Sequence, residues 1–272
     1  STDFLVFDTV AAGTTPANIQ LQGLIGQPAG PGGSFRGRLL LPVSDGQLAL
    51  FDVTTGKQSL VAYHPVKQPG EVVRWSDFAL PSDNANTFLV IRDRKSLQKI
   101  GINALPVPHL ELVGEMFFDA PVYNQVAATG ETAYLIRRGR DNDEIVGVSY
   151  DKLDERSSQE VSGRVVWGPY RLGNIVLVYT SGSRLYGFGP QQELLWRSDQ
   201  QVDLTPVGGG LQIGDQILVT GLDGTLWRVN AADGTTISEV NLNKRVIGTP
   251  FVVSEEVWIP TESGVLSGTV LE

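Results

Sequence analysis

The 272 residues carry 21 lysine and arginine side chains against 30 aspartate and glutamate, which gives a net charge of −9 at pH 7. Nucleic-acid binding and binding to anionic membranes both need clustered basic charge, so this balance argues against both classes of protein. The chain has no cysteine, which excludes disulfides, thiolate catalysis and cysteine-ligated zinc. No apolar run approaches the roughly 20 residues that span a bilayer, so we expect no membrane insertion.

Short apolar runs separated by Gly, Pro, Asp and Ser recur along the whole chain, and this pattern is typical of strands and turns rather than helices. The strongest runs are expected at residues 38–44, 87–93, 132–138, 175–181, 216–222 and 256–262. Each is followed by a second expected strand, at residues 47–53, 96–102, 144–150, 184–190, 225–231 and 265–271. These second strands begin about 40 to 49 residues apart, a spacing typical of a repeated four-stranded unit.

Tight turns are predicted between the paired strands. Three of them contain a glycine after a small polar residue, at Asp45-Gly46, Asp223-Gly224 and Ser263-Gly264. Glycine supplies the positive φ that a short hairpin turn needs. A single hairpin also fits a β-sandwich, but six hairpins in one phase favour a β-propeller.

We therefore predict an all-β protein, a β-propeller of four-stranded antiparallel blades that forms a single domain over residues 1–272. Six blades are expected, and a fragment of a seven- or eight-bladed propeller is the alternative. Residues 4–10 resemble one more second strand. Because an open strand edge invites aggregation, we expect the N-terminal segment to complete the last blade.

Two stretches carry a family resemblance. Residues 205–234 include Thr205-Pro206-Val207, Gly214-Asp215 and Asp223-Gly224-Thr225-Leu226-Trp227, and residues 46–57 contain Leu50-Phe51-Asp52 followed by Thr55-Gly56. Leu195-Trp196 stands where a blade-ending tryptophan is expected. The chain thus resembles the PQQ-like (quinoprotein-type) β-propeller repeat family, strongly over residues 164–272 and 36–57 and weakly over 66–163. WD, kelch and sialidase repeats fit less well.

The resemblance implies the fold more than a function, because one fold hosts many functions. A PQQ-dependent enzyme would need a calcium site, an aspartate base and an aromatic floor under the quinone. Many such enzymes also have a vicinal disulfide, which this chain cannot form, and the chain has roughly half the length of an eight-bladed enzyme. We therefore expect no cofactor, neither PQQ nor calcium.

Few residues suggest a metal-binding or catalytic role. Asp141, Asp143 and Glu144 supply closely spaced carboxylates that could hold calcium, and a solvated hairpin tip is the alternative. His64 and His109 are the two histidines of the chain, and both are expected to be solvated loop residues.

Aromatic and loop residues are open to two interpretations. The five tryptophans are expected to pack between blades, with a stacking platform for a sugar or peptide as the alternative. Loops 28–34 and 80–86 are flexible by composition and could belong either to a binding face or to plain connections.

The absence of a recognisable catalytic set favours a non-catalytic scaffold that binds another protein through one face of the propeller. The alternative is a propeller that binds a small molecule or a sugar, or an enzyme similar to PQQ-dependent oxidoreductases. The resemblance implies a bacterial extracytoplasmic location, periplasmic or in the cell envelope, and a cytoplasmic location stays open.

Overall fold

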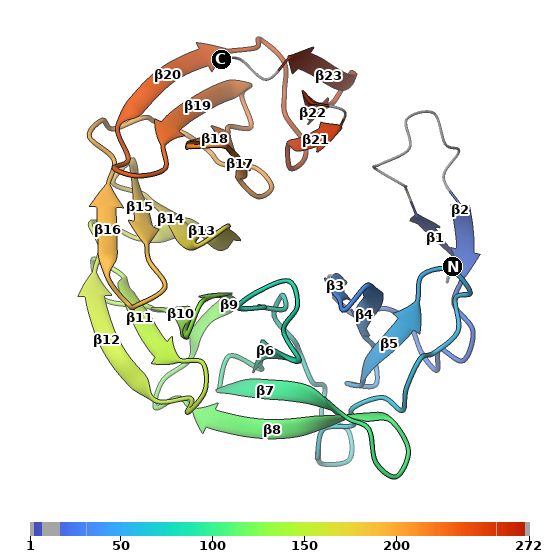
Figure 1. The fold of residues 1–272 in the computed structure, drawn as a ribbon. Helices are drawn as coiled ribbons and strands as arrows, with labels where there is room; N and C mark the ends of the chain where they lie inside the picture. Colours follow the sequence, from blue (N-terminus) through green and yellow to red (C-terminus); the bar gives the residue numbers. More distant parts are fainter. Residues whose placement is uncertain (1–2, 7–16, 31, 254, 270–272) are drawn as a thin grey trace. The chain divides into compact units, whose positions relative to one another are not determined.

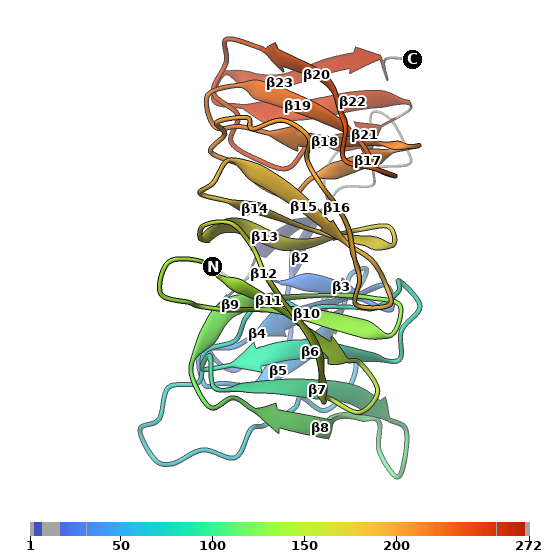
Figure 2. The same ribbon diagram turned by 90° about the vertical axis from the view of Figure 1, so that its left-hand side faces the viewer.

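The structure is a computed structural model that describes residues 3–6, 17–30, 32–253 and 255–269. The described residues form strands, turns and loops, and they contain no helix. Successive strands lie side by side within small antiparallel sheets (Figures 1 and 2). No segment in this part of the chain therefore qualifies as a membrane-spanning helix.

Three sheets have four strands each. They are formed by β9 (Val122–Thr129), β10 (Thr132–Arg137), β11 (Glu144–Ser149) and β12 (Glu155–Glu160); by β13 (Val165–Leu172), β14 (Ile175–Thr180), β15 (Arg184–Phe188) and β16 (Leu194–Arg197); and by β17 (Leu211–Ile213), β18 (Gln216–Thr220), β19 (Thr225–Asn230) and β20 (Thr236–Asn241). In each of these sheets the strands pair in chain order, so every connection is a hairpin.

The other sheets have three strands or two. They are formed by β3 (Gly33–Phe35), β4 (Arg38–Pro42) and β5 (Leu48–Asp52); by β6 (Thr87–Arg92), β7 (Ser96–Asn103) and β8 (His109–Phe117); by β21 (Phe251–Val253), β22 (Glu256–Thr261) and β23 (Gly264–Thr269); and by β1 (Asp3–Val6) with β2 (Ala17–Gln20). Isolated bridges extend two of them. Residues 58–63 bridge to β5 and residues 75–79 bridge to β6, which gives these sheets a fourth, irregular strand.

All six predicted hairpins are confirmed: β4–β5, β6–β7, β10–β11, β14–β15, β18–β19 and β22–β23. The three glycines of the predicted turns have positive φ, with values of 91° at Gly46, 95° at Gly224 and 128° at Gly264. The alternation of apolar residues and the turn glycines thus predicted both the strands and their pairing.

The chain divides into two compact units. In the described residues, the first contains most of the chain up to Arg137 together with Val146–Ser157, and the second contains Arg138–Ile145 and the chain from Ser158 onward. Each has a core of its own. Phe35, Leu48 and Phe88 are buried in the first unit, and Trp167, Tyr179 and Trp227 are buried in the second.

Two predictions about the whole chain are not tested by these units. The single domain over residues 1–272 stays a prediction. Strand β1 pairs with β2, and part of the segment 4–10 lies outside the described residues. Completion of the last blade by this segment therefore also stays a prediction.

Four of the five tryptophans are buried, which confirms the packing interpretation for them: Trp75, Trp167, Trp196 and Trp227. Three of these indoles donate a hydrogen bond to a backbone carbonyl far along the chain. The acceptors are Gly46 O for Trp75 at 3.0 Å, Gly208 O for Trp167 at 2.6 Å and Ala231 O for Trp196 at 2.8 Å. A buried indole N–H needs such a partner, so each tryptophan fixes a turn of a neighbouring sheet.

Tyr150, directly after β11, is buried in the first unit. Its hydroxyl donates to the Thr87 carbonyl at 2.7 Å and lies 2.9 Å from the Thr87 hydroxyl. Burial raises the pKa of Tyr150 to about 12. The folded state therefore favours the neutral phenol, and this contribution to stability is present below the unfolded pKa of about 10 and is lost as the pH rises towards 12.

We expect Tyr150→Phe to lower the free energy of unfolding by about 1 kcal/mol at pH 7, because Thr87 loses its partner. Above pH 10 the difference from the wild type should shrink. Urea unfolding at pH 7, 9, 10 and 11 measures this trend. Tyr63, whose pKa is also raised by burial, keeps some alkaline sensitivity in the variant. A difference that stays constant from pH 7 to pH 11 would contradict the assignment to Tyr150.

Candidate interaction surface

Residues 64–74, which we call the valine loop, connect the sheet of β3–β5 with the segment that bridges to β6. The loop combines buried anchors with exposed apolar side chains. Pro65 and Val73 are buried, whereas Val66 is 91 % exposed and Val72 is 67 % exposed. Isolated exposed valines are common on protein surfaces, so the question is whether the loop holds them in place.

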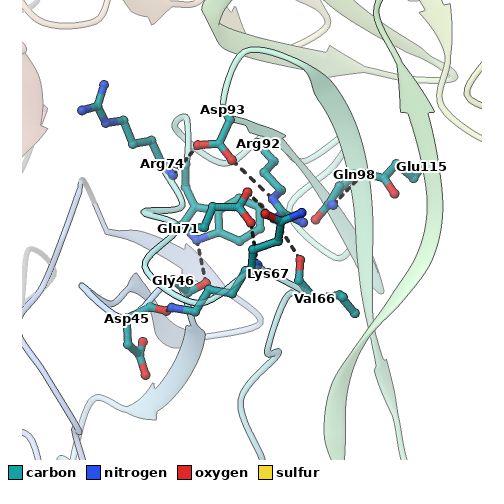
Figure 3. A network of polar contacts seen from close by, with 12 residues as sticks. Asp45, Gly46, Val66, Lys67, Glu71, Arg74, Arg92, Asp93, Gln98 and Glu115 are labelled. Carbon is teal, nitrogen blue, oxygen red and sulfur yellow. Dashed lines mark hydrogen bonds and ion pairs between the residues drawn. The ribbon is translucent and has the colours of Figure 1, made fainter.

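Arg92, at the end of β6, binds the valine loop (Figure 3). Its Nη2 donates to the Val66 carbonyl at 2.9 Å and lies 3.3 Å from a carboxylate oxygen of Glu71. Its Nε lies 3.4 Å from the Asp93 carboxylate. Only 17 % of the Arg92 side chain is exposed, so its guanidinium holds Val66 and Glu71 together in a partly desolvated position.

Glu71 forms hydrogen bonds within the valine loop. Its carboxylate accepts a hydrogen bond from the Gln68 backbone N–H at 2.8 Å, and its own N–H donates to the Gln68 carbonyl at 3.0 Å. The Gln68 N–H and then the Arg92 guanidinium hold the pKa of the Glu71 carboxyl below its usual range. Glu71 is therefore ionised at neutral pH, as its pairing with Arg92 requires.

The loop is also fixed to the turns on either side of it. Asp93 accepts from the Arg74 N–H at 2.8 Å and donates its own N–H to the Arg74 carbonyl at 2.8 Å. Lys67 donates to the Asp45 carbonyl in the β4–β5 turn. A Cβ at Gly46 would come within 3.0 Å of Val73, so the glycine permits this close approach.

A buried polar contact lies in the same unit. Gln98 on β7 donates to Glu115 on β8 at 2.7 Å (Figure 3). The Tyr63 hydroxyl lies 3.4 Å from the Gln98 side-chain oxygen. Because buried polar groups are costly when they are unpaired, these contacts help to fix the register of β7 against β8. Arg74 differs from the other charges of this region. Its guanidinium is directed away from the network and forms no ion pair among the described residues (Figure 3).

The three residues predicted as a calcium site differ in exposure. Asp141 is exposed, Glu144 is half-buried and Asp143 is completely buried. The Asp143 carboxylate accepts from Arg138 Nη1 and from the Val165 N–H at 2.8 Å, and Arg164 Nη1 lies 3.9 Å away. The solvated-tip interpretation is therefore wrong for Asp143, because two arginines and a backbone amide surround its carboxylate.

No group of three or more metal-ligating side chains occurs in the ranges that the structure describes. Calcium binding at Asp141, Asp143 and Glu144 was predicted from spacing alone, and it stays a prediction. No local pattern predicted that Arg138 and Arg164 would lie beside Asp143, because these contacts depend on how the turn folds.

The two histidines lie in different surroundings. His64 is exposed in the valine loop. His109 lies 2.8 Å from the Val107 carbonyl through Nδ1 and 3.7 Å from Glu111 through Nε2. The prediction of a solvated loop residue agrees with the position of His64, whereas it is wrong for His109, which begins strand β8 and is half-buried.

The two loops considered for a binding face have different structures. Residues 28–34 run along β4: Ala29 N–H donates to the Pro42 carbonyl at 2.9 Å, and Gly33 pairs with Leu40. In its described part, this segment thus pairs with β4 and its end rather than forming a free loop. Residues 80–86 form a turn in which the Ala85 N–H donates to the Ser82 carbonyl at 3.2 Å.

No family model matches the chain, and no curated protein matches it. Solved structures do. BamB from Moraxella catarrhalis aligns with a TM-score of 0.57 at 14 % identity over 92 % of this chain and 72 % of that one. BBS1N in complex with ARL6DN, soaked with lead, aligns with a TM-score of 0.61 at 12 % identity over 98 % of this chain and 84 % of that one.

The fold is a β-propeller. This confirms the predicted fold class, and the small antiparallel sheets are its blades. The number of blades stays a prediction. At these identities the likeness concerns the fold alone, so membership of the PQQ-like repeat family also stays a prediction.

Proposed function

We propose that this protein is a non-catalytic propeller scaffold that binds another protein through the valine loop. The observation that carries the proposal is that Val66 and Val72 are exposed on a loop whose backbone is fixed by Arg92, Glu71 and Asp93. A loop already held in one conformation loses little entropy on binding, which favours its use as a recognition element.

The structural neighbours support a scaffold in general terms. BBS1N is a propeller that was crystallised in complex with ARL6DN, so this fold serves for protein binding elsewhere. The exposed guanidinium of Arg74 adds a positive charge and hydrogen-bond donors to the loop. We infer a partner that offers an apolar pocket for the two valines and a carboxylate for Arg74.

The remaining parts of the hypothesis concern location, family and cofactors. A bacterial periplasmic or envelope location, a PQQ-like repeat origin and the absence of PQQ and calcium are proposed on the family resemblance. The likeness to BamB agrees with that resemblance at the level of fold.

The test is a capture experiment with loop variants. We expect Val66→Ala and Val72→Ala each to weaken partner binding about fivefold, which corresponds to about 1 kcal/mol of lost apolar burial. The double variant Val66→Asp with Val72→Asp should abolish capture from envelope or cytosolic extracts of the native organism. Because both side chains are exposed, the melting temperature should not change.

Val166→Asp is the matched control, since Val166 is an exposed strand valine of the other unit. Arg92→Met tests the role of the fixed conformation: it keeps both valines and should still weaken binding. A partner that binds the wild type and the double aspartate variant equally would refute the proposed surface.

A further inference from the structure

A cavity of about 410 Å³ lies within the second unit, between the blade of β17–β20 and the blade of β21–β23. Its walls are largely apolar. Leu218 and Leu226 line it from one blade, and Val257, Ile259 and Leu266 line it from the other. This volume is within the range of pockets that bind small organic molecules.

The two faces of the β17–β20 blade are packed differently. On the face opposite the cavity, Trp227 and Val229 lie in a continuous core and are completely buried. Neighbouring strand positions point to opposite faces of a sheet, and Leu218 and Arg228, which pair with each other, point to the cavity side. One face is thus filled by side chains of the adjacent blade, whereas the other retains open space.

Gly268 on β23 enlarges this space. It pairs with Val257, and Leu266 pairs with Ile259, so these four residues share the face that lines the cavity. A Cβ at Gly268 would meet no atom within 4 Å. The wall is therefore open where most strand residues would place a side chain.

Arg228 is the charged group of the lining. Its guanidinium donates from Nε to the Gln216 side-chain oxygen at 3.0 Å, and its Nη2 contacts the same oxygen. Among the described residues, the cavity lining includes no carboxylate and Arg228 forms no ion pair. A partly buried guanidinium with only a neutral amide acceptor retains donors for a carboxylate, which makes stronger, charge-assisted bonds.

We propose that this cavity binds the anion of a medium-chain fatty acid, with the carboxylate on Arg228 and the alkyl chain between Leu218 and Leu266. Apolar walls suit the alkyl chain, and the Arg228 guanidinium suits the head group. The site lies in the second unit and uses no residue of the valine loop, so it is independent of the proposed protein-binding function.

Isothermal titration calorimetry on the 272-residue chain tests the proposal with decanoate as the probe. We expect decanoate to bind at least tenfold more tightly than decanol, because only the acid pairs with Arg228. In the series from hexanoate to decanoate, each added methylene should strengthen binding about three- to fourfold until the cavity is filled. Equal binding of decanoate and decanol would overturn the assignment of the carboxylate to Arg228.

Two variants complete the test. Arg228→Met should remove the preference for decanoate over decanol, while Arg197→Met, an exposed arginine of the same unit, should leave it unchanged. Gly268→Leu should reduce decanoate binding more than tenfold. Its melting temperature without ligand should equal or exceed that of the wild type, because the new side chain occupies open space. Full decanoate affinity in a folded Gly268→Leu protein would overturn the location of the site.

Discussion

Replacing Asp143 with alanine is expected to lower the free energy of unfolding by about 3 kcal/mol. The Asp143 side chain is 0 % exposed and accepts hydrogen bonds from Arg138 and the Val165 N–H. Without it, Arg138 loses its carboxylate partner and Val165 loses a buried acceptor. Because 29 % of the Arg138 side chain remains exposed, water partly compensates, and we expect the low end of the range for a broken buried pair.

Urea unfolding followed by circular dichroism measures this change, with two variants for comparison. Asp143→Asn keeps the shape and one acceptor oxygen, so it should lose about half as much stability as Asp143→Ala. Asp141→Ala removes an exposed acid from the same turn and should change stability by less than about 0.5 kcal/mol.

The same variants separate a structural carboxylate from a calcium ligand. If the Asp143 carboxylate is only the acceptor for Arg138 and the Val165 N–H, added calcium should leave the melting temperature of the wild type unchanged. If calcium raises that temperature and both Asp141→Ala and Asp143→Ala abolish the rise, the ion-pair account would be contradicted and the calcium prediction confirmed.

Replacing Trp227 with alanine is expected to cost about 4 kcal/mol, the largest loss among our single substitutions. Trp227 is 0 % exposed and lies in the core between the blades of β13–β16 and β17–β20. Its ring stands edge-on to Tyr179, with centroids 6.4 Å apart and an interplanar angle of 80°. Its Nε1 donates to the Thr236 hydroxyl at 3.3 Å. Alanine would therefore leave a cavity where two blades meet and remove a hydrogen bond.

Trp227→Phe keeps part of the apolar volume, and we expect it to lose about half as much stability. Phe117→Ala is the control, because it removes an exposed aromatic ring and should be nearly neutral. Thermal unfolding of the three variants gives the order of the effects. A Trp227→Ala protein as stable as Phe117→Ala would show that the blades do not depend on this contact.

The strands illustrate what local sequence predicts well. The residues of β19 alternate between a buried core face and a more open face, β18 is a run of apolar residues, and Asp223-Gly224 marks the turn between them. The apolar pattern and the turn residues both lie within about 15 residues of sequence. Such local patterns can be recognised without knowing the tertiary structure. The same signals predicted the other five hairpins, and the repeat spacing then predicted the propeller.

The candidate sites were harder to predict. Arg92 appears in the sequence as the end of an apolar strand, yet it contacts Val66, 26 residues earlier. Asp143 appears as one acid of a polar turn, yet Val165 lies 22 residues later. Neither contact has a local pattern, because loop residues follow no period and their partners depend on how the loop folds back.

The sequence by itself determined the all-β class, the six hairpins, their turns and the burial of most tryptophans. It did so because strand periodicity and positive-φ glycines act over a few residues. Only the tertiary structure decided which polar groups became buried pairs, which valines stay exposed and where the packing between two blades leaves a cavity. These outcomes depend on side chains that are brought together from distant parts of the chain, and the free energy of such contacts is set by burial and partner geometry rather than by residue type.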